Sequence, residues 1–167
     1  AVLPYLCKGR IKLNERLMIL GDVKIQWAAR TPLASMDTLT KGMSGIVGHG
    51  NRALRSVATP QHKHPKLMLT TGACTVPNYT DTKQGAIGAF NHCLGALIVE
   101  IDGDVFYVRE LNADRHGSFI DLDMEFTPLG VKPAGRALSI SMGDIHQRFV
   151  LPQVVNATFT AKKSMVN

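Results

Sequence analysis

Short apolar runs that end at a glycine are the feature that most constrains how this chain can fold. The three runs cover residues 17–20, 66–71 and 137–142, and each is followed directly by a glycine. Apolar runs of about four to eight residues, bounded by turn-forming residues, are typical of buried β-strands, whereas amphipathic helices show a longer repeat. We therefore expect a sheet that contains a strand at each of these places.

A hairpin is the clearest element in the second half of the chain. Residues 94–101 and 105–111 are rich in apolar and β-branched side chains, and they flank Asp102-Gly103-Asp104. An Asp-Gly step between two such runs favours a tight hairpin turn, because glycine accepts the positive φ that the turn requires.

Residues 119–126 are expected to form one further strand. Apolar side chains alternate there with Asp121, Asp123 and Glu125, which gives one apolar and one acidic face. The acidic face could bind a hard cation through carboxylate oxygens, or it could be the solvated face of a half-buried strand.

Helical patterns are fewer and shorter than strand patterns. We expect short helices at residues 8–16, 35–41 and 84–93. A chain of 167 residues, of which 45% are hydrophobic, is within the usual size of one domain and can supply its core. The expected fold is a single mixed α/β (α+β) domain over residues 1–167, with a substantial, largely antiparallel sheet.

The sequence carries no signal for a membrane or for an oxidising compartment. No apolar run approaches the roughly 18 residues that span a bilayer, and the N-terminus lacks the charged start and apolar core of a signal peptide. Cys7, Cys74 and Cys93 form no C-x-x-C pair and leave an odd thiol, which disfavours a disulfide framework. We expect a protein of the cytoplasm, which is the host cytoplasm if the protein is viral.

The net charge of +6 is unevenly distributed. Residues 1–84 hold twelve Lys and Arg against four Asp and Glu and form a basic half, whereas residues 85–167 hold seven against nine. No acid lies between Asp37 and Asp81, and this window predicts a surface for nucleic acid or another phosphodiester, since phosphate contacts release counterions. The candidate contacts are Arg52, Arg55, Lys63, Lys66, His62 and His64. The alternative is a solvated region whose charge only keeps the protein soluble.

Candidate metal ligands follow the last apolar run, in Gly143-Asp144-Ile145-His146. In an extended backbone, residues two positions apart point to the same side, so the Asp144 carboxylate and the His146 imidazole can converge on one cation. A carboxylate with an imidazole suits zinc, manganese or iron. The alternative is an ordinary Gly-Asp turn with an unrelated histidine nearby.

The G-D-x-H pattern resembles the first motif of the calcineurin-like metallophosphoesterases. Much of residues 5–160 also resembles a region that precedes this motif in large tailed-phage proteins of that type. The segments that carry this second resemblance are 21–26, 70–81, 92–96 and 117–122. The resemblance implies a metallophosphoesterase-like layered sandwich, a divalent transition metal (Mn, Zn or Fe), and a catalytic role for His146 in phosphodiester hydrolysis.

A complete binuclear site cannot be built from this chain in the order of that family. Residues 147–167, which follow the motif, contain no Asp, Glu, His or Cys. We therefore expect an internal fragment of a larger protein, in which the rest of the parent chain or a second copy supplies ligands. Within the chain, Asp22 follows a predicted strand and His92 precedes one, so Asp22 is a further candidate ligand and His92 a further catalytic candidate. The alternative for His92 is a histidine at the core edge, bonded to a backbone carbonyl.

Two functions remain open. The first is a metal-dependent phosphoesterase or nuclease segment, in which the metal activates water and the isolated chain is inactive. The second is a non-catalytic nucleic-acid-binding or assembly module of a phage protein, in which the basic half makes the contacts.

Overall fold

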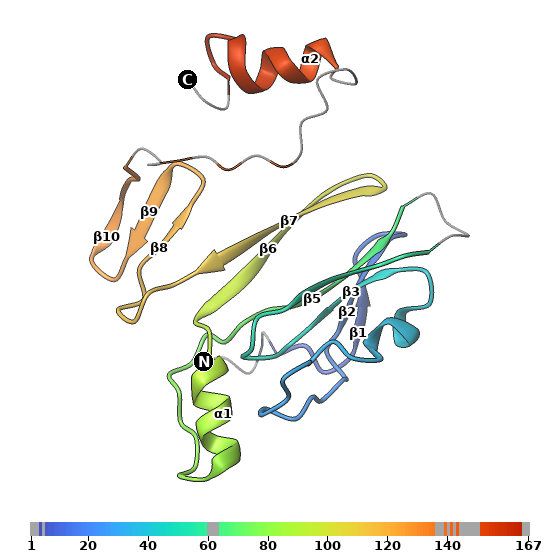
Figure 1. The fold of residues 1–167 in the computed structure, drawn as a ribbon, viewed down its shortest axis with the longest axis vertical. Coiled ribbons are helices and arrows are strands. Elements are labelled where there is room, and N and C mark those ends of the chain that lie inside the picture. Colours follow the sequence, from blue (N-terminus) through green and yellow to red (C-terminus); the bar gives the residue numbers. More distant parts are fainter. Residues whose placement is uncertain are drawn as a thin grey trace. The chain divides into compact units, whose positions relative to one another are not determined.

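Figure 1 shows the computed structural model of the protein, which describes residues 4, 6–59, 64–135, 139, 141, 143 and 151–164. The chain forms two compact units, Ala1–Ala134 and Gly135–Asn167. Its length had favoured the prediction of a single domain. In the second unit the structure describes a short helix, α2 (Pro152–Val155), and the π-helical turn η4 (Asn156–Thr160). All the described strands belong to the first unit.

A five-stranded sheet forms the centre of the first unit. Its strands lie in the order β1-β2-β3-β5-β4. Their bounds are Arg10–Lys12 (β1), Leu17–Leu20 (β2), Ser44–Val47 (β3), Leu54–Val57 (β4) and Lys66–Thr70 (β5). Strands β2, β3 and β5 pair in parallel, while β1 and β4 pair antiparallel at the two edges. The strands predicted at 17–20 and 66–71 are confirmed.

Successive residues of the parallel strands pack on opposite faces of this sheet, as the pleat requires. The buried cluster on one face contains Leu17, Ile46 and Leu69. The buried cluster on the other face contains Leu20, Leu33, Val47 and Met68. Because both faces are covered, adjacent residues of the central strands, such as Ile46 and Val47 or Met68 and Leu69, are both apolar and buried.

A long hairpin covers one of these faces (Figure 1). Strands β6 (Gly95–Asp102) and β7 (Val105–Asn112) pair antiparallel, which confirms the predicted hairpin. Its Leu97, Val99, Phe106 and Val108 pack against the first cluster. Side chains from the connection between β2 and β3 cover the other face, and this connection includes the 3-10 helix η2 (Met36–Thr40), which was predicted near residues 35–41.

The single strand predicted over residues 119–126 is wrong. The chain forms two strands there, β8 (Phe119–Asp121) and β9 (Met124–Thr127), and with β10 (Gly130–Pro133) they make a three-stranded antiparallel sheet. Leu122 has a φ of 54° and is 72% exposed, so the chain reverses at that residue. A two-residue turn leaves the alternation of apolar and acidic residues uninterrupted, which is why the pattern did not reveal it.

One regular α-helix belongs to the described part of the first unit, α1 (Lys83–Asn91), and it confirms the helix predicted near 84–93. The Thr82 hydroxyl caps it by accepting a hydrogen bond from the Gly85 N–H at 3.0 Å. The helix predicted at 8–16 is wrong, because β1 pairs there with β2, and Arg10 is the register partner of Leu20. Strand pairing with a buried neighbour overrides a weak helical preference.

The structure confirms a mixed α+β protein with several sheets and few short helices. Of the seven pairings between the described strands, five are antiparallel, and the two parallel pairings lie at the centre of the largest described sheet. Among the described residues, no helix has the length and apolar character needed to cross a membrane.

Candidate functional site at the carboxyl edge of the parallel strands

The carboxyl ends of β2, β3 and β5 lie at one edge of the sheet, because these strands are parallel. The segments that leave this edge are residues 21–22, 48–52 and 71–72. Open α/β sheets often place functional groups at such an edge. We therefore asked whether Asp22 lies close to other candidate residues at this edge.

Asp22 is at this edge, but its carboxylate is paired with Arg10. The two carboxylate oxygens accept hydrogen bonds from Arg10 Nε at 2.9 and 3.2 Å. The two side chains are 39% and 45% exposed, so this is a surface ion pair. A metal ion at Asp22 would have to displace the guanidinium.

His92 follows α1 and uses both ring nitrogens. Nε2 lies 2.9 Å from the Thr75 carbonyl oxygen, which can only accept, so Nε2 carries the proton and donates. Nδ1 then accepts from the Tyr79 hydroxyl at 2.8 Å. This is the arrangement of a histidine bonded to a backbone carbonyl, and it leaves no free ring nitrogen for a metal or for proton transfer.

His49, which the sequence analysis did not select, connects two loops at the same edge. It is 7% exposed. Its Nδ1 accepts from the Asn51 N–H at 3.0 Å, and its Nε2 donates to the Gln26 carbonyl at 3.1 Å. The imidazole is therefore a structural link between residues after β2 and residues after β3.

Arg52 was predicted to contact phosphate, but its side chain is only 13% exposed. Its Nε lies 3.3 Å from Glu110 Oε2, and its guanidinium nitrogens are buried and make no hydrogen bond within the described residues. The guanidinium carbon would be 3.9 Å from a Cβ at Gly95, which places it against the start of β6. Arg52 is thus a buried partner of the hairpin rather than a surface cation.

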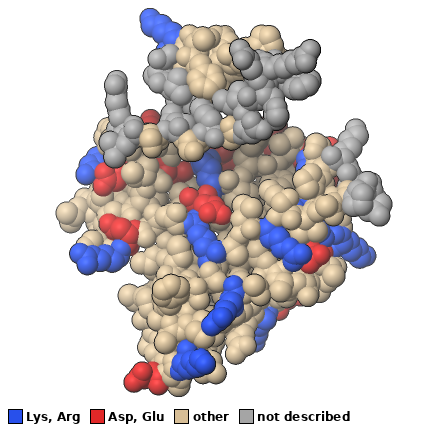
Figure 2. Space-filling view, viewed as in Figure 1, with Lys and Arg blue, Asp and Glu red and all other residues tan. Residues whose placement is uncertain are grey.

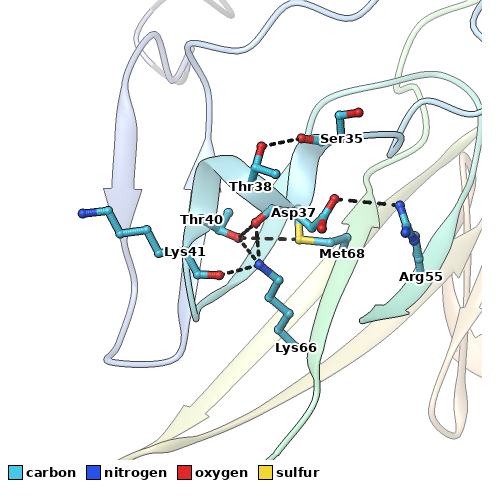
Figure 3. A network of polar contacts seen from close by, with 8 residues as sticks. All are labelled: Ser35, Asp37, Thr38, Thr40, Lys41, Arg55, Lys66 and Met68. Atoms are coloured by element: carbon cyan, nitrogen blue, oxygen red, sulfur yellow. Dashed lines mark hydrogen bonds and ion pairs between the residues drawn. The ribbon is translucent and has the colours of Figure 1, made fainter. Parts of the chain in front are cut away.

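Lys66 is also buried, at 5% exposed, and Figure 3 shows its polar contacts. Its ammonium donates to the backbone carbonyls of Asp37 and Lys41, and it lies 3.4 Å from Thr40 Oγ1. These groups belong to η2 and the residue after it, where the last carbonyls of a helix lack partners within the helix. Lys66 therefore satisfies the end of η2 and does not face solvent, contrary to its predicted role.

The structure describes two of the remaining predicted phosphate contacts, Arg55 and His64. Arg55 lies on the edge strand β4, is 51% exposed, and has Nη1 3.8 Å from Asp37 Oδ1 (Figure 3). The His64 backbone carbonyl accepts from the Thr59 hydroxyl at 2.7 Å. His62 and Lys63 lie outside the described residues, as do Asp144 and His146 and most of the strand predicted before them.

The predicted acidic face is divided by an arginine. Arg109 in β7 donates from Nε and Nη2 to Asp121 at 2.8 and 3.2 Å, and its Nη1 lies 2.6 Å from Glu100. The hydrogen bond to Asp121 raises the pKa of Arg109, with a smaller contribution from Glu100. The same contact lowers the pKa of the Asp121 carboxyl below its usual 3.8. This carboxylate is an ion-pair partner and not part of a cation site.

Within the part of the chain that the structure describes, no three His, Cys, Asp or Glu side chains come together as a possible metal site. Among these described residues, Asp22 and His92 therefore do not form a metal site with a third His, Cys, Asp or Glu side chain. Figure 2 shows lysine and arginine side chains scattered singly among uncharged and acidic neighbours on the visible face. Among the described residues of the window between Asp37 and Asp81, Arg52 and Lys66 are enclosed by the protein, whereas Arg55 is exposed.

Comparison with known proteins gives one informative match. Protein A1 of Escherichia phage T5 is 33% identical to this chain over 149 residues, which is 85% of the chain and 27% of Protein A1. The match supports a phage origin. The chain spans about 27% of the length of this relative. No protein family and no solved structure matches the chain.

Proposed function

We propose that this chain is the part of a phage protein that leads into a metal-dependent phosphoesterase or nuclease site, with Asp144 and His146 as metal ligands. The Gly143-Asp144-Ile145-His146 pattern after an apolar run carries this proposal. The relatedness to Protein A1 supports the phage origin in this proposal, and the metal-dependent chemistry rests on the sequence pattern. The layered sandwich of that family and a location in the host cytoplasm are parts of the same proposal.

The donor set fits the proposed metal. A carboxylate and an imidazole two residues apart suit manganese, zinc or iron. When bound, such a metal lowers the pKa of a coordinated water and polarises a phosphoryl oxygen. Asp22 and His92 do not fit as further ligands, because Arg10 occupies one and Tyr79 and Thr75 occupy the other. The other ligands would come from the remainder of a longer protein or from a second copy.

Metal binding tests the proposal directly. We expect the chain to bind Mn²⁺ or Zn²⁺ in a calorimetric titration, and Asp144→Asn to weaken that binding about tenfold or more, because the amide removes a charged ligand. Asp123→Asn is the matched control, since Asp123 is an exposed acid in the turn between β8 and β9. Equal binding by the Asp144 variant and the parent chain would reject the metal site.

Nucleic-acid binding without catalysis is the second candidate function. It is favoured by basic side chains that make no hydrogen bond or ion pair with any residue the structure describes. In the first unit these are Lys8, Arg16, Lys24, Arg30, Lys41 and Lys83, of which Arg16 lies over the Phe106 ring. Binding of a labelled duplex that weakens steeply with salt, by a slope of about −0.9 for each phosphate contact, would support it. No binding at low salt would remove nucleic acid as a partner.

A further inference from the structure

We propose that a groove between α1 and the turn that carries Trp27 and Arg30 binds single-stranded nucleic acid. This inference deepens the second candidate function and rests on its nucleic-acid partner. It uses residues that lie outside the basic window predicted from the sequence.

The groove runs along one face of α1. It has a volume of about 520 Å³ and is lined by Arg30, Lys83, Ala86, Ile87, Phe90 and Asn91. The spacing of the helical residues places them on a single face, because positions three and four apart are neighbours on a helix. The volume is within the usual range of small-ligand sites, about 300–1,000 Å³.

On the side of α1 away from the groove, the turn that carries Trp27 packs closely against Gly88 of the helix. A Cβ at Gly88 would lie 2.6 Å from Trp27 Cε3 and 2.8 Å from Tyr79 Cε1, so only glycine allows this close approach. Trp27 and Tyr79 also pack together, with ring centroids 5.5 Å apart. Arg30, three residues after Trp27, is therefore held beside a helix whose position is set by ring packing.

One aromatic ring is accessible in the groove, that of Phe90, and Trp27 packs on the other side of α1. Phe90 is 89% exposed and Trp27 is 43% exposed. A base can stack on an exposed ring whatever its identity, and stacking of this kind needs bases that are not already paired in a duplex. The exposed phenylalanine in the groove therefore favours a single strand over double-stranded DNA.

Two cations flank the exposed ring. Neither Arg30 nor Lys83 makes a hydrogen bond or ion pair with another described residue. Lys83 is the first residue of α1, where the helix dipole adds partial positive charge. The nearest acid along the chain is Asp81, two residues before Lys83 and outside the groove lining. The combination of free cations and a stacking surface matches alternating phosphates and bases.

The single tryptophan of the chain makes the test direct. Oligo-dT of about 12 nucleotides, within the range of known single-strand sites, is titrated into the 167-residue chain in EDTA while Trp27 fluorescence and oligonucleotide anisotropy are followed. We expect saturable binding with a change in Trp27 emission, and weaker binding by a duplex of the same length.

Variants separate stacking from charge. We expect Phe90→Ala to weaken oligo-dT binding about tenfold, and Arg30→Ala with Lys83→Ala to reduce the salt slope by about 1.4, or 0.7 for each lost phosphate contact on a single strand. Arg115→Ala with Lys132→Ala removes the same two charge types far along the chain and should leave both quantities unchanged. All four of these charged residues are exposed or half-exposed, so the variants should fold.

Three results would overturn the groove assignment: no binding at low salt, equal affinity of Phe90→Ala, or a duplex bound as tightly as oligo-dT. The metal proposal is judged separately, because oligo-dT binding is measured in EDTA and Asp144→Asn should not alter it. Loss of metal binding would therefore leave the groove intact, and failure of the groove would leave the metal site intact.

Discussion

The ammonium of Lys66 in β5 is bound to the backbone carbonyl of Asp37 in η2 (Figure 3). The contact joins a buried strand to the helix that covers one face of the central sheet. It gives Lys66 a structural role, although the residue belongs to a basic window that was expected to meet phosphate. The charge is retained in the interior because carbonyl oxygens surround it.

Replacement of Lys66 tests this role. We expect Lys66→Met to lower the free energy of unfolding by about 2–4 kcal/mol, because the apolar chain keeps its volume while the Asp37 and Lys41 carbonyls lose their donor. Urea unfolding followed by circular dichroism measures the change. Arg55→Ala is the control, since Arg55 is 51% exposed and its pair with Asp37 should contribute at most about 1 kcal/mol. Equal effects of the two substitutions would contradict the structural role.

Glu110 is expected to stabilise the folded protein, because its carboxylate neutralises the charge of the Arg52 guanidinium. Glu110→Ala would leave the buried Arg52 guanidinium without its counter-charge and should lower the free energy of unfolding by about 3 kcal/mol. Adding Arg52→Met should recover most of that loss, because the unpaired charge is then gone. The control is Glu125→Ala, whose partner Lys132 is 62% exposed. Additive losses in the double variant would argue against a coupled pair.

The Arg109–Asp121 contact predicts a dependence of stability on pH. Its hydrogen bonds lower the pKa of the folded Asp121 carboxyl below the ordinary value of 3.8, so the stabilising effect is complete above that value and is lost as the pH falls through the folded pKa. We expect the stability difference between the parent chain and Asp121→Asn to shrink in that acidic window. Chemical unfolding at a series of pH values measures it. A difference that stays constant on acidification would contradict the assignment.

Catalysis should need more metal ligands than these 167 residues supply. We expect negligible phosphodiesterase turnover by the 167 residues alone, because the residues after His146 contain no further carboxylate or imidazole. A longer protein should hydrolyse a chromogenic phosphodiester when metal is added, and His146→Ala should abolish that activity. Robust turnover by the isolated chain would show that it supplies its own ligands.

Local patterns in the sequence predicted β2, β5 and the long hairpin, but not β3, which lies between β2 and β5. Residues 17–20 and 67–69 are apolar throughout, and Asp102-Gly103-Asp104 marks a turn that needs no distant contact to form. The same reasoning was wrong for β1, whose three residues are a strand only because β2 lies beside them. It was also wrong at Leu122, because a tight turn keeps the two-residue alternation of side chains.

The sequence by itself determined which segments are apolar enough to form a core, where turns can occur, and that the first half carries excess positive charge. Only the tertiary structure decided which of those charges remain in solvent. Lys66 is enclosed by η2, and Arg52 is enclosed by the β6–β7 hairpin. Arg30 and Lys83, by contrast, line one groove although 52 residues separate them in the chain. The physical reason is that hydrophobic patterning acts between near neighbours, while the solvation and pairing of a charge depend on whatever distant segment packs against it.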